Sequence, residues 1–182
     1  MARLKDKYRN EIRPGLMREL GLKNLLAVPR VDKIVVNMGL GDAYTDAKIL
    51  DAGMAELAAI TGQKPKVTRA RKSISGFKLR AGDPVGLMVT LRGKRMRGFF
   101  EKLVNIVLPR LRDFHGVSRK SFDGGGNYSL GIEEHAVFPE IDPNKIGKIK
   151  GLEVTIVTTA ETDEEGLKLL ESLGMPFEKK DG

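Results

Sequence analysis

Apolar residues recur along the chain at two spacings, and each spacing predicts a different kind of element. A four-residue spacing over residues 2–20 places one apolar residue on the same side of each turn and predicts a helix. The residues of this stripe are Leu4, Tyr8, Ile12, Leu16 and Leu20. Pro14 interrupts the pattern and is expected to kink the helix, and Gly21 is expected to end it.

Three further segments have a helical period. The first runs to about Thr61, ends at Gly62, and is expected to bury Ala47, Leu50, Met54, Leu57 and Ala58. The second runs from about Lys94 to Val107 and ends at Pro109. The third follows Thr162, which forms a capping box with Glu165, and stops at Gly174.

Five short segments are rich in β-branched residues or alternate in hydrophobicity, which is typical of strands. They are 31–38, 67–70, 85–91, 128–132 and 152–159. In 85–91 the alternation puts Val85, Leu87, Val89 and Leu91 toward the core, so that Thr90 and then Arg92 point the other way. In 31–38 both faces are largely apolar, and the direction of Asn37 stays open.

This irregular mixture of helices and strands predicts an α+β fold, with a largely antiparallel β-sheet, helices packed on one face and a wet face opposite. At 182 residues the chain is expected to be a single domain, 1–182. The segment at about 64–84 has turn residues and no clean period. It predicts a long projecting loop, and long ordered loops are usually functional.

The charge of that loop also indicates a functional role. The net charge is +8, and the isoelectric point is near 9.7. Residues 64–97 hold eleven lysines and arginines against one acid, Asp83, whereas residues 133–182 have a net charge of −6. A basic centre of this kind favours a polyanionic partner.

Sequence features of enzymes and metal sites are weak. The chain has no cysteine and two histidines, His115 and His135, twenty positions apart, so no metal ligand set is expected. The acids at 163–165 suit the first turn of a helix, so no catalytic residue is expected. The turn Gly39-Leu40-Gly41 resembles a dinucleotide-binding start but has Tyr44 in place of the third glycine. A nucleotide-dependent enzyme using this turn is the alternative interpretation.

The basic segment fits RNA better than a solvated surface or a membrane. Its lysines and arginines alternate with hydroxyl groups and with Ile74 and Phe77, which can pack on unpaired bases. It carries turn residues where a membrane-binding helix would need amphipathic periodicity. There is no run of 18 apolar residues, and the charged start, Met1 to Lys7, predicts no secretory signal.

Several longer motifs resemble one family. They are Lys72-Ser73-Ile74-Ser75-Gly76-Phe77-Lys78-Leu79-Arg80, Val35-Val36-Asn37-Met38-Gly39-Leu40-Gly41, Ile60-Thr61-Gly62-Gln63-Lys64-Pro65, Leu108-Pro109-Arg110-Leu111-Arg112-Asp113-Phe114, Phe122-Asp123-Gly124-Gly125-Gly126-Asn127-Tyr128 and Val157-Thr158-Thr159-Ala160. In this order, from Tyr8 to Phe177, they resemble the bacterial large-subunit ribosomal protein five, the 5S rRNA-binding protein of the central protuberance.

The resemblance implies a structural protein of the cytoplasmic ribosome, without enzymatic activity, cofactor or small-molecule substrate. Its partners would be 5S rRNA, 23S rRNA, P-site tRNA through the basic loop, and small-subunit ribosomal protein thirteen across an intersubunit bridge. The expected 5S rRNA-binding residues are Asn37, Gly39, Gln63, Lys64, Thr68, Arg69, Thr90 and Arg92. The expected tRNA-contacting residues are Arg71, Lys72, Ser73, Ile74, Ser75, Phe77, Lys78 and Arg80.

The chain departs from the family pattern at a few positions. The family usually has arginine at Gly125, often arginine at His115, and more commonly asparagine at Gly76. His135-Ala136-Val137 replaces a triplet that resembles Gln-Leu-Ile. These positions concern the bridge side and one polar contact in the loop, and they leave the expected RNA-facing residues untouched.

Overall fold

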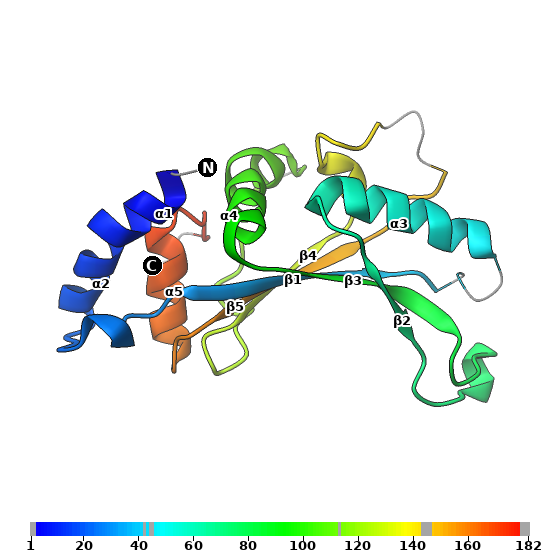
Figure 1. Ribbon diagram of the computed structural model, residues 1–182, viewed down its shortest axis with the longest axis horizontal. Helices are drawn as coiled ribbons and strands as arrows, with labels where there is room; N and C mark the ends of the chain where they lie inside the picture. The colour runs from blue at the N-terminus through cyan, green and yellow to red at the C-terminus, as the bar shows by residue number, and fades with distance from the viewer. Residues whose placement is uncertain (1–2, 42, 44–45, 113, 143–146, 179–182) are drawn as a thin grey trace. The chain divides into compact units, whose positions relative to one another are not determined.

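The protein has an α+β fold in a computed structural model that describes residues 3–41, 43, 46–112, 114–142 and 147–178. Its five-stranded antiparallel sheet has the strand order β2-β3-β1-β5-β4 (Figure 1). The strands are β1 (Val31–Gly39), β2 (Lys66–Arg69), β3 (Pro84–Leu91), β4 (Tyr128–Ile132) and β5 (Leu152–Thr158). The fold class predicted from the sequence is confirmed.

The helices follow the predicted segments closely. They are α1 (Arg3–Lys7), α2 (Arg13–Glu19), α3 (Ala47–Thr61), α4 (Gly93–Lys102) and α5 (Asp163–Ser172). A π-helical turn, Tyr8–Ile12, joins α1 to α2 into one first helix, and a second, Leu103–Val107, continues α4. Single 3₁₀ turns lie at Leu25–Ala27, Ser75–Phe77, Leu108–Arg110 and His135–Val137.

The strands alternate between buried and partly exposed residues, as predicted for a sheet with one covered face. In β3, Leu87, Val89 and Leu91 are buried, whereas Met88 and Thr90 are only partly so. In β1 the buried set is Ile34, Val36 and Met38. Asn37 therefore lies on the face opposite the core, which the apolar pattern of this strand had left open.

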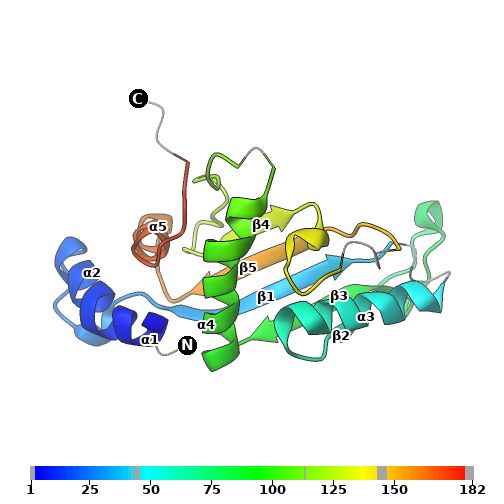
Figure 2. The same cartoon turned by 90° about the horizontal axis from the view of Figure 1, so that it is seen from above.

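The chain divides into two compact units. Unit 1 comprises residues 1–34, 92–130 and 155–182, and unit 2 comprises residues 35–91 and 131–154. In unit 1 the first helix is tied to α5 by an ion pair between Glu19 and Lys168, at 3.3 Å. In unit 2, α3 packs on the core face of β3, and Figures 1 and 2 both show the 70–83 loop pointing away from α3.

The buried face of α3 agrees only in part with the predicted stripe: Leu57 is buried, and Leu50, Met54 and Ala58 are partly buried. Its buried residues are Gly53, Leu57, Ile60 and Thr61, whereas Ala47 is exposed. Gly53 is the reason: a Cβ atom there would lie 3.0 Å from Leu40 Cδ1 and 3.2 Å from Leu87 Cδ1. The helix packs closest to the sheet where it has no side chain, and a hydrophobicity pattern does not register that position.

The glycine-rich segment of unit 1 is a hydrogen-bonded structural loop. Asp123 Oδ1 accepts from the amides of Gly125 and Asn127, at 2.9 and 3.1 Å. Asp163, at the start of α5, accepts from the amides of Gly124 and Gly126. The side-chain hydrogen bond from Asn127, followed by the Gly125 amide, lowers the pKa of Asp123. The Asp123 bonds shape the loop itself, and the Asp163 bonds hold it against α5.

Candidate nucleic-acid interface

Among the described residues of unit 2, one face of the sheet is covered by no helix of that unit. This open face consists of Val35 and Asn37 on β1, Met88 and Thr90 on β3, and Lys66 and Thr68 on β2. Antiparallel pairing of β2 with β3 aligns Lys66 with Met88 and Thr68 with Gly86. Alternation along each strand therefore gathers the three short polar side chains Asn37, Thr68 and Thr90 on one surface.

Gly86 lets the backbones on the open face approach each other. A Cβ atom at this position would lie 2.6 Å from the Met38 carbonyl oxygen and 3.2 Å from Thr68 Oγ1. Any larger residue would push β1 and β3 apart beneath Asn37 and Thr68. The glycine thus keeps the polar groups of neighbouring strands at close spacing.

The hydroxyl of Thr90 is available to a ligand. Thr90 is partly buried, and its carbonyl oxygen accepts from Gln63 Nε2 at 3.2 Å. Within the described part of the chain, its Oγ1 makes no hydrogen bond. The amide of Gln63 binds the backbone of β3, and this bond fixes the turn after α3.

On the sheet of unit 2, positive charge lies at β2 and the turn before it. Lys64, Lys66 and Arg69 are exposed there, and Arg69 Nη1 donates to the Gly82 carbonyl at 2.8 Å. On the β5 side, a shallow hollow next to Asn37 is lined by the carboxylates Glu133 and Glu153. The sheet is therefore polarised, and its basic edge suits phosphates better than its acidic edge.

The 70–83 loop is an ordered hairpin. Ala70 exchanges backbone hydrogen bonds with Gly82 and Asp83 at its base, and Ile74 exchanges two with Leu79 nearer the tip. The tip is the 3₁₀ turn Ser75–Phe77, followed by Lys78 in the left-handed region at φ +52°. Asp83 accepts from the amide of Arg80 at 2.8 Å, so the one acid of this basic segment builds the turn at its base.

The side chains of this loop project into solvent. All eight expected tRNA-contacting residues are exposed, and the exposed fractions of Phe77 and Ile74 are 73% and 45%. Ser73 Oγ accepts from the Ala81 amide at 3.0 Å, which leaves its hydroxyl proton free to donate. A hairpin that holds two large apolar side chains among four cations suits stacked bases flanked by phosphates.

The eighth residue expected to bind 5S rRNA, Arg92, lies outside unit 2. It is exposed in unit 1, where it precedes the first turn of α4. The other seven, Asn37, Gly39, Gln63, Lys64, Thr68, Arg69 and Thr90, belong to unit 2.

The glycine turn after β1 does not build a dinucleotide site. Leu40 is buried, and its amide donates to the Val85 carbonyl at 3.0 Å, so the turn is tied to β3. The strand that follows α3 is β2, whereas β1 is flanked by β3 and β5. A dinucleotide-binding unit needs a parallel strand beside the first one. Tyr44 lies outside the described residues.

Three charged or titratable side chains form a buried cluster in unit 2, which the sequence did not predict. Lys150 Nζ donates to Glu56 Oε2 at 2.6 Å, and His135 Nε2 lies 3.3 Å from the same oxygen. The Lys150 amide donates to His135 Nδ1 at 3.1 Å, so the neutral imidazole carries its proton on Nε2. Burial lowers the pKa of His135, and Lys150 adds to this effect while Glu56 opposes it.

Comparison with known proteins identifies the family. The family model described as "Ribosomal protein L5" matches residues 24–80, and the model that describes the C-terminus of the same ribosomal family matches residues 84–177. The chain belongs to the ribosomal protein L5 family. It is therefore a ribosomal protein with a structural, non-enzymatic role, which confirms the resemblance and rules out the nucleotide-dependent enzyme.

Relatives in this family cover nearly the whole chain. The "Large ribosomal subunit protein uL5" of Roseiflexus castenholzii is 62% identical over 177 residues, 97% of this chain and 98% of the relative. Proteins of the same description from Anaeromyxobacter sp. (strain K) and Macrococcus caseolyticus are 62% and 56% identical, over 97% and 98% of this chain. The matched regions make up 98% and 100% of these two relatives' own lengths.

None of the helices in the described residues is long and apolar enough to cross a membrane. In the same residues, histidines, aspartates and glutamates do not gather in groups of three that could hold a metal ion.

Proposed function

We propose that this L5-family chain is a structural protein of the large ribosomal subunit that binds 5S rRNA with the open face and basic edge of unit 2. The observation that carries this proposal is the uncovered sheet face, where Asn37, Thr68 and Thr90 stand beside Lys66 and Arg69. Polar side chains on a fixed sheet position bases and riboses, and neighbouring cations neutralise phosphates.

The 70–83 loop contacts a second RNA, the P-site tRNA. Its hairpin projects from the end of the sheet, so it reaches a ligand that the open face does not. Its large apolar side chains are too exposed to serve the core of this protein. In the same proposal, 23S rRNA is a further partner. The glycine-rich loop 123–127 lies on the side that meets small-subunit ribosomal protein thirteen across the subunit interface.

A pair of variants tests the two RNA assignments. Thr90→Val keeps the shape of the side chain and removes its hydroxyl, and should weaken 5S rRNA binding by about 1 kcal/mol, a roughly fivefold change. Thr155→Val is the matched control, since the Thr155 hydroxyl already bonds Ser129 at 3.1 Å. Filter binding at one stated salt concentration measures both variants. Equal affinity of Thr90→Val and the parent would remove Thr90 from the interface.

The loop variant replaces the residues between Lys72 and Lys78 with a short glycine linker. Because loops tolerate changes of length cheaply, the fold and most of the 5S rRNA affinity should remain. Retention of P-site tRNA on reconstituted ribosomes should fall, since the linker removes Ile74 and Phe77 and draws the cations back. Complete loss of 5S rRNA binding with unchanged tRNA retention would show that the loop has been assigned to the wrong RNA.

A further inference from the structure

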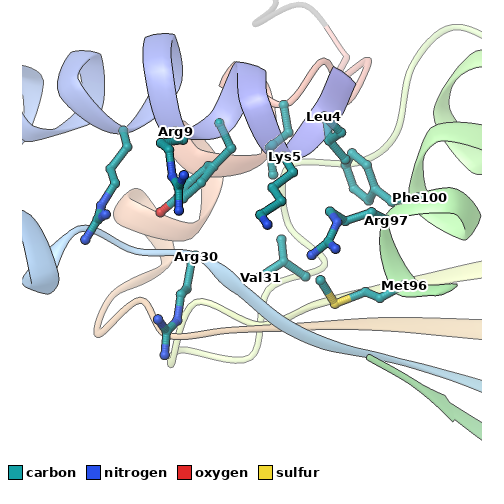
Figure 3. Close-up of a pocket in the computed structure, with 11 residues that line it drawn as sticks. Leu4, Lys5, Arg9, Arg30, Val31, Met96, Arg97 and Phe100 are labelled. Carbon is teal, nitrogen blue, oxygen red and sulfur yellow. The ribbon is translucent and has the colours of Figure 1, made fainter. Parts of the chain in front are cut away.

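A cavity of about 330 Å³ lies in unit 1, and its lining includes none of the residues assigned to RNA above. Its walls come from the first helix, the start of β1, α4 and the end of α5 (Figure 3). The apolar residues lining it are Leu4, Val31, Met96, Phe100 and Leu173. This volume is near the lower limit of ligand pockets, about 300–1,000 Å³, and suits one small ligand.

Cations dominate the polar part of the wall. Lys5, Arg9, Arg13, Arg30 and Arg97 line the cavity, and no aspartate or glutamate does so among the described residues. In Figure 3 the charged ends of Lys5 and Arg97 approach each other above Val31, with Arg9 on the same side of the cavity. Like charges gathered around an apolar hollow repel one another, and an anion would relieve that repulsion.

Among the residues that the structure describes, four of these cations have no charged partner. Lys5, Arg9, Arg30 and Arg97 make no ion pair with another described residue. Arg13 is different, because its Nε and Nη2 donate to the Leu25 carbonyl at 3.1 and 2.9 Å. The unpaired guanidinium groups are therefore available to an external ligand.

One aromatic wall is held in place. Tyr8 lines the cavity, and its hydroxyl donates to the Pro29 carbonyl at 2.9 Å. Burial raises the pKa of Tyr8 although Arg13 and Arg30 oppose the effect, so the phenol stays neutral and keeps this bond. A fixed aromatic side chain beside arginines provides a surface on which a base can stack.

We propose that this cavity binds one unpaired nucleotide of an RNA strand, with the base against the apolar wall and the phosphate between Lys5, Arg9 and Arg97. Arginine forks suit both phosphates and carboxylates, but an acidic peptide side chain has no flat apolar body to fill the hollow. A nucleotide has both a charged phosphate and a flat base. The inference rests on the RNA-binding part of the proposed function and adds a site that reads single-stranded RNA.

Two kinds of variant of the full chain test the site. Arg9→Gln with Arg97→Gln removes charge, and Arg110→Gln with Arg112→Gln removes the same charge from exposed positions of unit 1. Val31→Phe fills the hollow and leaves every charge in place, with Leu4→Phe as a second filling variant should the first lower the melting temperature. Fluorescence polarisation of labelled single-stranded hexaadenylate at one low salt concentration measures binding.

The pocket variants and both filling variants should lose at least tenfold in hexaadenylate affinity, whereas the Arg110/Arg112 control should change less than twofold. AMP should displace the hexamer, and inorganic phosphate or hexaglutamate at the same concentration should not. If the filling variants bind hexaadenylate like the parent, the hollow takes no base and only the surface charge binds RNA. The proposal would then be wrong. Equal competition by phosphate or by hexaglutamate, or binding of AMP without the hexamer, would also overturn it.

The two proposals fail in different ways. Loss of the hexamer in the pocket variants, together with normal 5S rRNA binding by Thr90→Val, would sustain the pocket and remove Thr90 from the proposed open-face interface. The reverse pattern would sustain the open face alone.

Discussion

His135 shows how one buried side chain sets a pH dependence. It is fully buried, its Nδ1 accepts from the Lys150 amide, and its Nε2 faces Glu56 without an aligned hydrogen bond. Burial holds its pKa below the ordinary value of 6.5. Below pH 6.5, His135 binds a proton in the unfolded chain more readily than in the folded chain. Folding is therefore favoured above the unfolded pKa and weakens as the pH falls below it.

His135→Gln should flatten this dependence. A glutamine carbonyl can accept from the Lys150 amide, and its NH₂ group can donate toward Glu56, without titrating. Urea unfolding at pH 7.5 and 5.5 should show the parent losing stability by at most about 1.4 kcal/mol per pH unit, and the variant losing less. His115→Gln, at an exposed histidine, is the control and should keep the parent's slope. Parallel slopes for parent and His135→Gln would contradict the assignment.

At the scale of elements, the helices accommodate Pro14 and Pro109 in the same way, with a π-helical turn before each proline. Pro14 and Pro109 lack the amide that would bond the carbonyl four residues back. The residue before each proline bonds five residues back instead: Arg13 to Tyr8, and Leu108 to Leu103. A π-helical turn therefore precedes each proline, and the first helix continues past its expected kink.

Gly126 and Gly166 lie at a backbone contact that leaves no room for a side chain. A Cβ atom on Gly166 would lie 2.6 Å from the Gly126 carbonyl oxygen, and backbone cannot yield as a flexible side chain does. The Gly126 carbonyl also accepts from Thr158 Oγ1 at 2.8 Å. Helix α5, the glycine-rich loop and β5 thus meet at one point.

Gly166→Ala should destabilise the protein by about 1–3 kcal/mol, since it pushes α5 off the loop. Thermal unfolding should show a melting temperature lower by about 2–4 °C for each kcal/mol. The matched control is Gly15→Ala in α2, where a Cβ atom meets nothing within 4 Å and alanine favours the helix. A stable Gly166→Ala protein beside an unstable Gly15→Ala protein would contradict this packing argument.

The period of hydrophobic residues predicted most elements, because each strand and helix buries one face. It identified the core face of β3 and, for α5, the cap at Thr162, which accepts from the Glu165 amide at 3.4 Å. In α3 it found the buried Leu57 but missed Gly53, which has no hydrophobic side chain to count. The hydrophobic period could not predict sites built from residues far apart in the sequence. In unit 2, for example, Glu56, His135 and Lys150 meet in one cluster but share no local sequence pattern.

The same limit applies to the cavity in unit 1. Its cations are scattered over positions 5–13, 30 and 97, and in the sequence each resembles an ordinary surface residue. The 70–83 loop was predictable because its charges, turns and apolar residues are contiguous. Contiguous sites can be predicted from a single sequence, whereas assembled sites need the fold.

At the scale of the whole molecule, charge should govern RNA affinity. The net charge is +8, and residues 64–97 alone carry ten positive charges more than negative ones. With on the order of five phosphate contacts, the logarithm of 5S rRNA affinity should fall with the logarithm of salt concentration at a slope of about −3.5 to −4.5. Filter binding across a salt series measures this slope. A slope near zero would show that the basic residues are solvated and bind no phosphates.

The exposed hairpin at residues 70–83 also has a consequence for the lifetime of the protein. It offers Arg71, Lys72, Lys78 and Arg80 in an exposed turn, the kind of segment that proteases cut first. If RNA covers the hairpin, as proposed above, an assembled copy hides the peptide bonds after these residues, whereas a surplus copy displays them. Degradation would then remove unassembled chains selectively and keep the supply of this protein matched to the number of ribosomes.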